Sequence, residues 1–196
     1  MFAMPTAVAL SQWIGVLGCG CPNSSSVMQK KIPSLQFNKR VPSSASAADA
    51  TTKRRIAHIV KNNGFRVGFT TSDGIYVQNS MLTKGDTTGP VSAEFILKDP
   101  TVEFAVLETA RGGILRSGLG FNTCDIGVVT NIQEDHLGLS DIHNLDDLTR
   151  VKAVVIGAVR RKGWAVLNAD NGYCVRIAKD ARCNVAYFSM DENNPV

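Results

Sequence analysis

Short apolar runs, separated by polar and glycine-containing turns, dominate the chain after residue 50 and predict alternating strands and helices. The expected strands are 66–70, 102–109, 124–131, 164–168 and 184–189, each a short apolar run between turn residues. The expected helices are 51–63, 90–98, 172–181 and a long helix that begins at Asn144 and ends at Gly163. This alternation predicts an α/β fold with a mainly parallel, doubly wound sheet flanked by helices.

Two of the predicted strands end in polar clusters. Glu108 follows the apolar run 102–107, and the segment from Thr130 to His136 follows the run 126–129. In open α/β sheets, ligands bind beyond the carboxyl ends of parallel strands. Glu108 and His136 lie 28 residues apart, close to the length of one strand–crossover–strand unit. Adjacent parallel strands could therefore present both side chains at one edge of the sheet.

A carboxylate and an imidazole at one edge are candidate metal ligands. Magnesium prefers oxygen ligands, whereas manganese and zinc accept histidine more readily, so the residue types leave the metal's identity open. The structural alternative is that Glu108 pairs with Arg111 and that His136 caps a turn.

The same residues carry a family resemblance. The run Leu-Glu-Thr-Ala-Arg-Gly-Gly-Ile-Leu-Arg at 107–116, followed by Thr130-Asn131-Ile132 and by Asp-His-Leu-Gly at 135–138, resembles the central Mur-ligase-type domain of cyanophycin synthetases. Segments 70–76, 84–90, 150–155 and 165–170 agree in the same order, and the resemblance covers about residues 51–196. It implies an ATP-dependent amide ligase that activates an aspartate side-chain carboxylate as an acyl phosphate and joins arginine to it.

The resemblance also implies roles for individual residues. Glu108 and His136 would hold Mg²⁺, and Lys152 would act near a second metal. Arg111 is a candidate anion clamp on its own chemistry, because a planar guanidinium matches carboxylate or phosphate oxygens, and the alternative is a solvated arginine. The nucleotide contacts assigned to ATP are Thr51, Thr52, Asn131, Asn168 and Asp170. The residues alone leave other uses open, since Lys152 also fits a lysine snorkelling from a packed helix, and Asn168 and Asp170 also fit a turn cap.

One departure from the family concerns the phosphate loop. Mur-type enzymes carry Gly-Thr-Asn-Gly-Lys-Thr directly before the first helix, whereas this chain has Ala-Ser-Ala-Ala-Asp-Ala at 45–50, with Asp49 in the lysine's place. Glycine lets backbone amides wrap a phosphate and lysine neutralises it, whereas a carboxylate repels it. We expect weak or absent ATP turnover. Lys53 lies one helical turn further on and would need a rearranged loop to replace the missing lysine.

The first 48 residues differ in composition from the rest. They contain four basic residues, no acidic residue and eight serines, and they account for the whole net charge of +4. This composition is typical of an organellar transit peptide or of a disordered extension. We expect a cytoplasmic protein, or an organellar one if 1–48 is a transit peptide, with the Mur-type domain over 49–196. Neither a membrane-spanning stretch nor a basic, aromatic-rich stripe for nucleic acid is present in the sequence.

Three interpretations of the chain follow. It is a fragment of an ATP-dependent ligase whose other lobes lie elsewhere, a non-catalytic relic that binds metal or a partner, or an assembly module for another ligase subunit. Expected partners are ATP, an amino-acid or polymer substrate, and either further copies of the chain or the missing ligase domains.

Overall fold

A computed structural model describes residues 14–19, 50–134 and 142–196, with only the backbone for 14–19 and 50–52. The strands are β1 (Ile14–Cys19), β2 (Val67–Thr70), β3 (Gly74–Val77), β4 (Ser80–Lys84), β5 (Phe104–Glu108), β6 (Cys124–Val129), β7 (Val159–Asn168) and β8 (Asn184–Phe188). The helices are α2 (Ala50–Asn62), α3 (Pro90–Lys98), α4 (Arg111–Ser117), α5 (Leu145–Gly157) and α6 (Gly172–Ala178).

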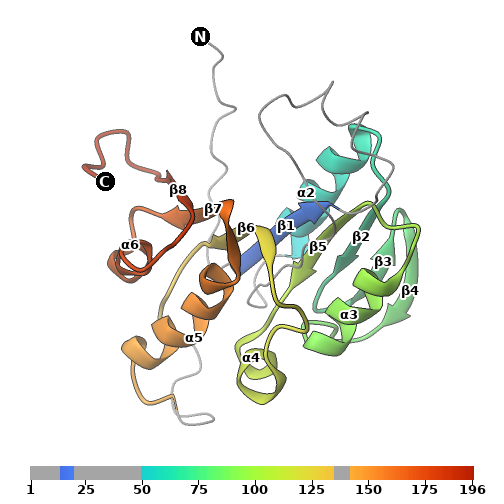
Figure 1. The fold of residues 1–196 in the computed structure, drawn as a ribbon, viewed down its shortest axis with the longest axis horizontal. Coiled ribbons are helices and arrows are strands. Elements are labelled where there is room, and N and C mark those ends of the chain that lie inside the picture. Colours follow the sequence, from blue (N-terminus) through green and yellow to red (C-terminus); the bar gives the residue numbers. More distant parts are fainter. Residues whose placement is uncertain (1–13, 20–49, 135–141) are drawn as a thin grey trace.

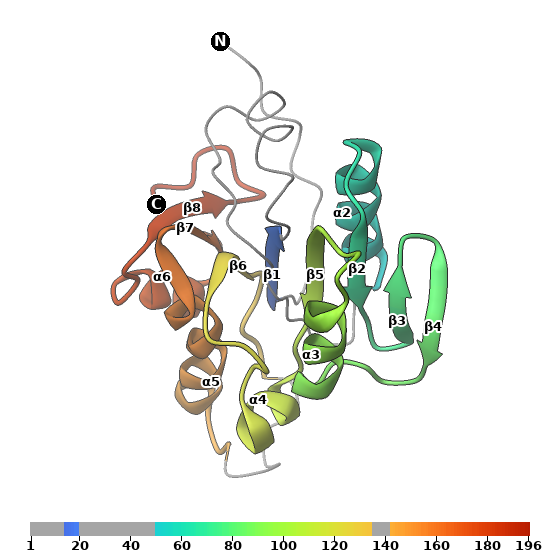
Figure 2. The ribbon, with the colours of Figure 1, turned by 45° about the vertical axis from the view of Figure 1, so that its right-hand side comes forward.

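Within the described ranges, eight strands form one sheet in the order β4-β3-β2-β5-β1-β6-β7-β8. The pairs β2–β5, β6–β7 and β7–β8 are parallel, whereas β2, β3 and β4 form an antiparallel edge. Helix α2 covers one face, and α3, α4 and α5 cover the other (Figures 1 and 2). The predicted α/β class, with parallel strands flanked by helices, is confirmed.

Strand β1 lies in the middle of the sheet and was not predicted. It pairs antiparallel with β5 on one side and with β6 on the other (Figure 2). The expectation that the strands leading to Glu108 and His136 are neighbours is therefore wrong. Two strand spacings, about 10 Å, separate the ends of β5 and β6.

The core explains why β5 is a continuous apolar run. Phe104 and Val106 pack with Ala57 of α2 on one face, whereas Ala105 and Leu107 pack with α3 on the other. Both faces of the strand are buried, so every position is apolar until the strand reaches its end. Glu108 has the same parity as Phe104 and Val106, and its side chain therefore points to the α2 face.

The long helix after Asn144 ends earlier than predicted. Its cap is as expected, because the Asn144 side chain accepts a hydrogen bond from the Asp147 amide at 2.8 Å. The helix stops at Gly157, however, and Val159 already belongs to β7, where it pairs with Cys124. Val159 continues the helical apolar period, but strand pairing decides its conformation. The prediction of helix over 158–163 is wrong.

Candidate functional site at the carboxyl edge of the sheet

The carboxyl ends of β2, β5, β6 and β7 meet at one edge of the sheet, where most of the predicted site residues lie. The structure divides them into two hydrogen-bonded groups on either side of β1. The Glu108 cluster comprises Lys53, Thr70, Ser72 and Glu108; the Asn131 cluster comprises Thr130, Asn131, Lys152, Asn168 and Asn171. Lys53 comes from α2 and Lys152 from α5, on opposite faces of the sheet.

Glu108 is fully enclosed in the first cluster. Its Oε2 accepts hydrogen bonds from Lys53 Nζ and from the Ser72 backbone amide, the latter at 3.1 Å. The side chains of Lys53 and Glu108 both have 0% of their surface exposed. The Glu108 amide donates to Thr70 Oγ1 at 2.9 Å, which fixes the end of β5 against the end of β2. The alternative pairing of Glu108 with Arg111 is replaced by this contact with Lys53.

Hydrogen bonds connect the loop of residues 85–89 to the segments that follow β2 and β5. Thr87 Oγ1 donates to the Thr71 carbonyl oxygen at 2.6 Å, and the Ala110 amide donates to the Thr88 carbonyl oxygen at 2.9 Å. Asp86 Oδ1 accepts from the amide and hydroxyl of Thr88, so the loop uses its own polar groups to hold its turn. Arg111 is the first residue of α4 and is half-buried beside this loop.

The Asn131 cluster connects β6, β7, α5 and α6. Lys152 Nζ donates to the Asn131 carbonyl oxygen at 2.8 Å, and Lys152 is buried, which confirms that the side chain reaches inward to this edge. Asn168 donates to the Thr130 carbonyl oxygen at 2.9 Å. Asn171 donates to Asn131 Oδ1 at 2.5 Å and also caps α6 by accepting from the amides of Tyr173 and Cys174.

Asn171 was not predicted as a site residue. The signal available in the sequence is its position directly before Gly172, at the start of a predicted helix, where asparagine is a preferred cap. Its second role, the bond to Asn131 from 40 residues away, depends on the tertiary fold.

The remaining predicted residues lie apart from these clusters. Asp170 turns to the loop after β8, where its carboxylate accepts from Ser189 Oγ and from the Met190 amide at 2.8 Å. These hydrogen bonds hold the pKa of Asp170 below its usual value. Thr51 and Thr52 lie in the first turn of α2, and their side chains are outside the description. His136 also lies outside the described residues, so its pairing with Glu108 stays a prediction.

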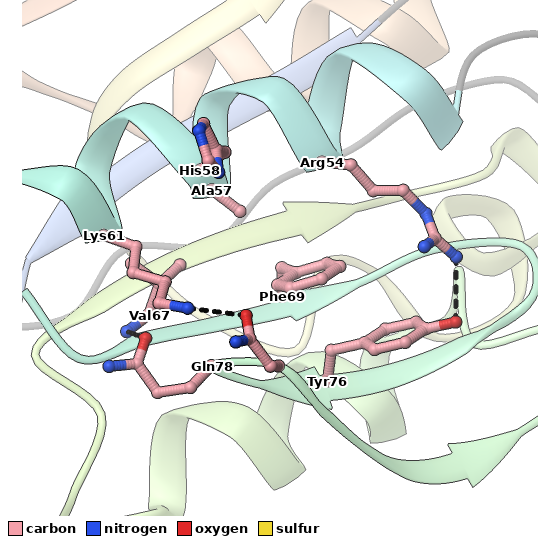
Figure 3. A pocket seen from close by; sticks show the side chains of 9 residues that line it. Arg54, Ala57, His58, Lys61, Val67, Phe69, Tyr76 and Gln78 are labelled. Carbon is pink, nitrogen blue, oxygen red and sulfur yellow. Dashed lines mark hydrogen bonds between the residues drawn. The ribbon is translucent and has the colours of Figure 1, made fainter.

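A hollow of about 220 Å³ lies beside the Glu108 cluster, between α2 and the β2–β3 hairpin. Figure 3 shows Arg54 reaching from α2 to Tyr76, whose hydroxyl accepts its hydrogen bond at 2.9 Å. The Tyr76 hydroxyl donates to Asp73 in turn, and Tyr76 stacks on Phe69 with ring centroids 4.7 Å apart. Lys61 donates to Asn79 at 2.6 Å. The hydrogen bonds of Arg54 and Lys61 join α2 to β3 and to the turn that follows it.

The described residues do not fit a divalent metal. Among them, no group of three or more His, Cys, Asp or Glu side chains is placed to hold one. Magnesium requires near-octahedral oxygen coordination and retains several waters, whereas Glu108 Oε2 is already bonded to an ammonium and an amide inside an enclosed site. The structure therefore supports no step that passes through a metal at Glu108.

Residues 50–196 match the family model of the Mur ligase middle domain, and the chain belongs to this family. It is 55% identical over 146 residues to a cyanophycin synthetase of Geminocystis herdmanii (strain PCC 6308) and 53% identical to that of Synechocystis sp. (strain ATCC 27184 / PCC 6803 / Kazusa). Each match covers 74% of this chain and 17% of the relative. The predicted resemblance is confirmed, and the family consists of ATP-dependent amide ligases.

A solved UDP-N-acetylmuramoyl-L-alanyl-D-glutamate--2,6-diaminopimelate ligase shares the fold, with a TM-score of 0.56 and 19% identity over 73% of this chain and 30% of that chain. The chain thus spans about a sixth of the cyanophycin synthetases that it matches. None of the helices in the described part is long and apolar enough to cross a bilayer.

Proposed function

We propose that this chain is a fragment of an ATP-dependent ligase that joins arginine to an aspartate side-chain carboxylate, and that alone it has little or no turnover. In this reaction the carboxylate takes the γ-phosphoryl group of ATP, ADP leaves, and the arginine amine then displaces phosphate to form the amide. The observation that carries the proposal is the identity of 52–55% to cyanophycin synthetases over about three quarters of the chain.

The Asn131 cluster supports a site for anionic ligands at the carboxyl edge. Lys152 brings a buried positive charge to the end of β6, and Arg111 begins α4 directly after β5. A fixed ammonium and a planar guanidinium are suited to hold phosphoryl and carboxylate oxygens. We assign Lys152 and Arg111 to this role, with Asn131 and Asn168 placing the neighbouring backbone. Thr51 and Thr52 stay proposed contacts of the nucleotide.

A second candidate function is a non-catalytic module that assembles with other ligase domains. Two observations favour it: Asp49 stands where the phosphate loop needs lysine, and Lys53 already neutralises Glu108. Such a module would keep the fold and the surface of a ligase domain without its nucleotide chemistry.

A chimaeric enzyme separates the two candidates. In this chimaera, residues 54–196 of this chain replace the matching segment of the Geminocystis herdmanii relative. The relative keeps its own phosphate loop and its own residue at the place that aligns with Lys53 of this chain. The ligase proposal predicts arginine-dependent release of ADP by this chimaera and loss of that release with Lys152→Met. A folded chimaera without ADP release refutes the ligase proposal. Co-sedimentation of the native chain with the relative's remaining domains would then support the assembly module.

Calorimetric titration of the native chain with magnesium and ATP gives an independent measurement. We expect no heat of nucleotide binding, because both glycines and the lysine of the phosphate loop are replaced. A saturable heat would show that the chain binds ATP without that loop.

A further inference from the structure

The contact between Lys53 and Glu108 joins two charges that are fully removed from water. Both side chains have no exposed surface, and Glu108 has the strand parity that points it at α2. An isolated carboxylate or ammonium is costly to bury, and in this contact each group compensates the charge of the other. The ion pair also joins α2 to the end of β5, which are 55 residues apart in sequence.

The ammonium and the Ser72 amide together take the lone pairs of one Glu108 oxygen. Oε2 accepts from both donors, whereas Oε1 is buried and makes no hydrogen bond with the residues that the structure describes. An ammonium is a compact cation with three donors, and it neutralises a carboxylate without needing waters or further anionic ligands. Magnesium, in contrast, needs six oxygen ligands in a nearly fixed geometry.

Neighbouring residues hold this arrangement in place. Arg54, directly after Lys53, donates to the Tyr76 hydroxyl (Figure 3). It also donates to Asp73 at 2.5 Å, so two consecutive residues of α2 are bonded to the sheet side of the fold. The Glu108 amide is fixed by Thr70 on the strand side. The backbone on both sides of the ion pair is therefore anchored by neighbouring hydrogen bonds.

We propose that the Lys53 ammonium is the resident counter-ion of Glu108 and takes the place of a divalent cation there. The domain accordingly folds without metal, and Glu108 does not bind magnesium while Lys53 is present. Removing the lysine charge leaves the Glu108 carboxylate with the Ser72 amide as its described donor and with Oε1 unbonded, so a divalent cation can then replace the ammonium at Glu108. This inference does not depend on the chain having ligase activity.

The test is a titration of the purified full chain with Mn²⁺, followed by electron paramagnetic resonance, combined with thermal unfolding in MgCl₂ and in NaCl of equal ionic strength. For the wild type we expect no saturable binding of Mn²⁺ and equal unfolding midpoints in the two salts. For Lys53→Met we expect a lower midpoint in NaCl that rises in MgCl₂, because an ion that binds only the folded state stabilises it. Lys61→Met, on the same helix with the neutral partner Asn79, is the matched control and should not respond to magnesium.

The double variant Lys53→Met with Glu108→Gln decides whether any bound metal is at Glu108. It has no buried charge to compensate, and it should neither bind Mn²⁺ nor respond to magnesium. Saturable binding of Mn²⁺ to the wild type that disappears in the double variant overturns the proposal. So does a folded Lys53→Met variant that ignores magnesium. If Lys53→Met folds only when refolded in MgCl₂, the proposal is supported; if it folds in neither salt while the double variant folds, the proposed cation site is refuted.

Discussion

Breaking the Lys53–Glu108 pair should cost far more stability than breaking any exposed ion pair of this domain. Lys53→Met leaves the Glu108 carboxylate enclosed with the Ser72 amide as its described donor, and Glu108→Gln removes the carboxylate that the enclosed Lys53 ammonium contacts. Removing one partner of a buried pair typically costs about 3–5 kcal/mol. For a domain of this size, each kcal/mol lowers the midpoint of thermal unfolding by about 2–4 °C.

The pair Lys98–Glu94 is the matched control. It is an i,i+4 pair on α3 with side chains 76% and 48% exposed, and exposed helical pairs contribute about 0.3–0.5 kcal/mol. Lys98→Met is therefore the same substitution in a solvated setting. The double variant of Lys53→Met and Glu108→Gln should cost less than the sum of its single variants, because it removes both charges together.

Urea unfolding followed by far-ultraviolet circular dichroism measures these free energies. The reasoning predicts a loss for Lys53→Met several times that for Lys98→Met, and strong non-additivity in the cycle. A loss for Lys53→Met no larger than that for Lys98→Met would refute it, as would additive costs of the two single variants.

Three further predictions concern other parts of the domain. Burial raises the pKa of Asp125 to about 6, against the opposing effect of Arg160 at 2.9 Å. The folded state then holds the Asp125 proton more tightly than the unfolded state, so the free energy of unfolding decreases as the pH rises from about 4 through about 6. Urea unfolding at about pH 4 and at about pH 6 should show a smaller decrease for Asp125→Asn than for the wild type. Asn144→Ala removes the cap of α5 and should cost about 1 kcal/mol in urea unfolding. Asn171→Ala should cost more than Asn144→Ala in the same assay, because it removes a cap and two hydrogen bonds to the Asn131–Ile132 segment.

The spacing of apolar residues predicted most strands and helices correctly. Both faces of β5 and one face of α5 are buried, and the buried positions are apolar in the sequence. It failed at 158–163, where Val159 fits the helical period but pairs with Cys124 in β7. It also missed α4 and the β3–β4 hairpin. The hairpin turns at Gln78, a non-glycine residue with a φ of 56°, so the usual glycine signal of a tight turn is missing.

The sequence predicted which residues lie at the candidate site, but it did not predict which of them contact one another. Strand ends identified Glu108, Asn131 and Asn168, and helical spacing predicted that Lys152 reaches inward, as it does. The partner of Glu108 could not be predicted, because Lys53 lies 55 residues away and local pattern ties it to the phosphate loop. The strand order could not be predicted either, because β1, which lies between β5 and β6, is far from both strands in sequence.

The central claim is that this Mur ligase middle domain neutralises Glu108 with its own lysine. A crystal structure of the full chain grown in MnCl₂, with anomalous scattering recorded for manganese, tests it most directly. The account predicts Lys53 Nζ within hydrogen-bonding distance of Glu108 and no anomalous peak beside that carboxylate. A manganese peak coordinated by Glu108, with the Lys53 side chain turned away, would contradict it.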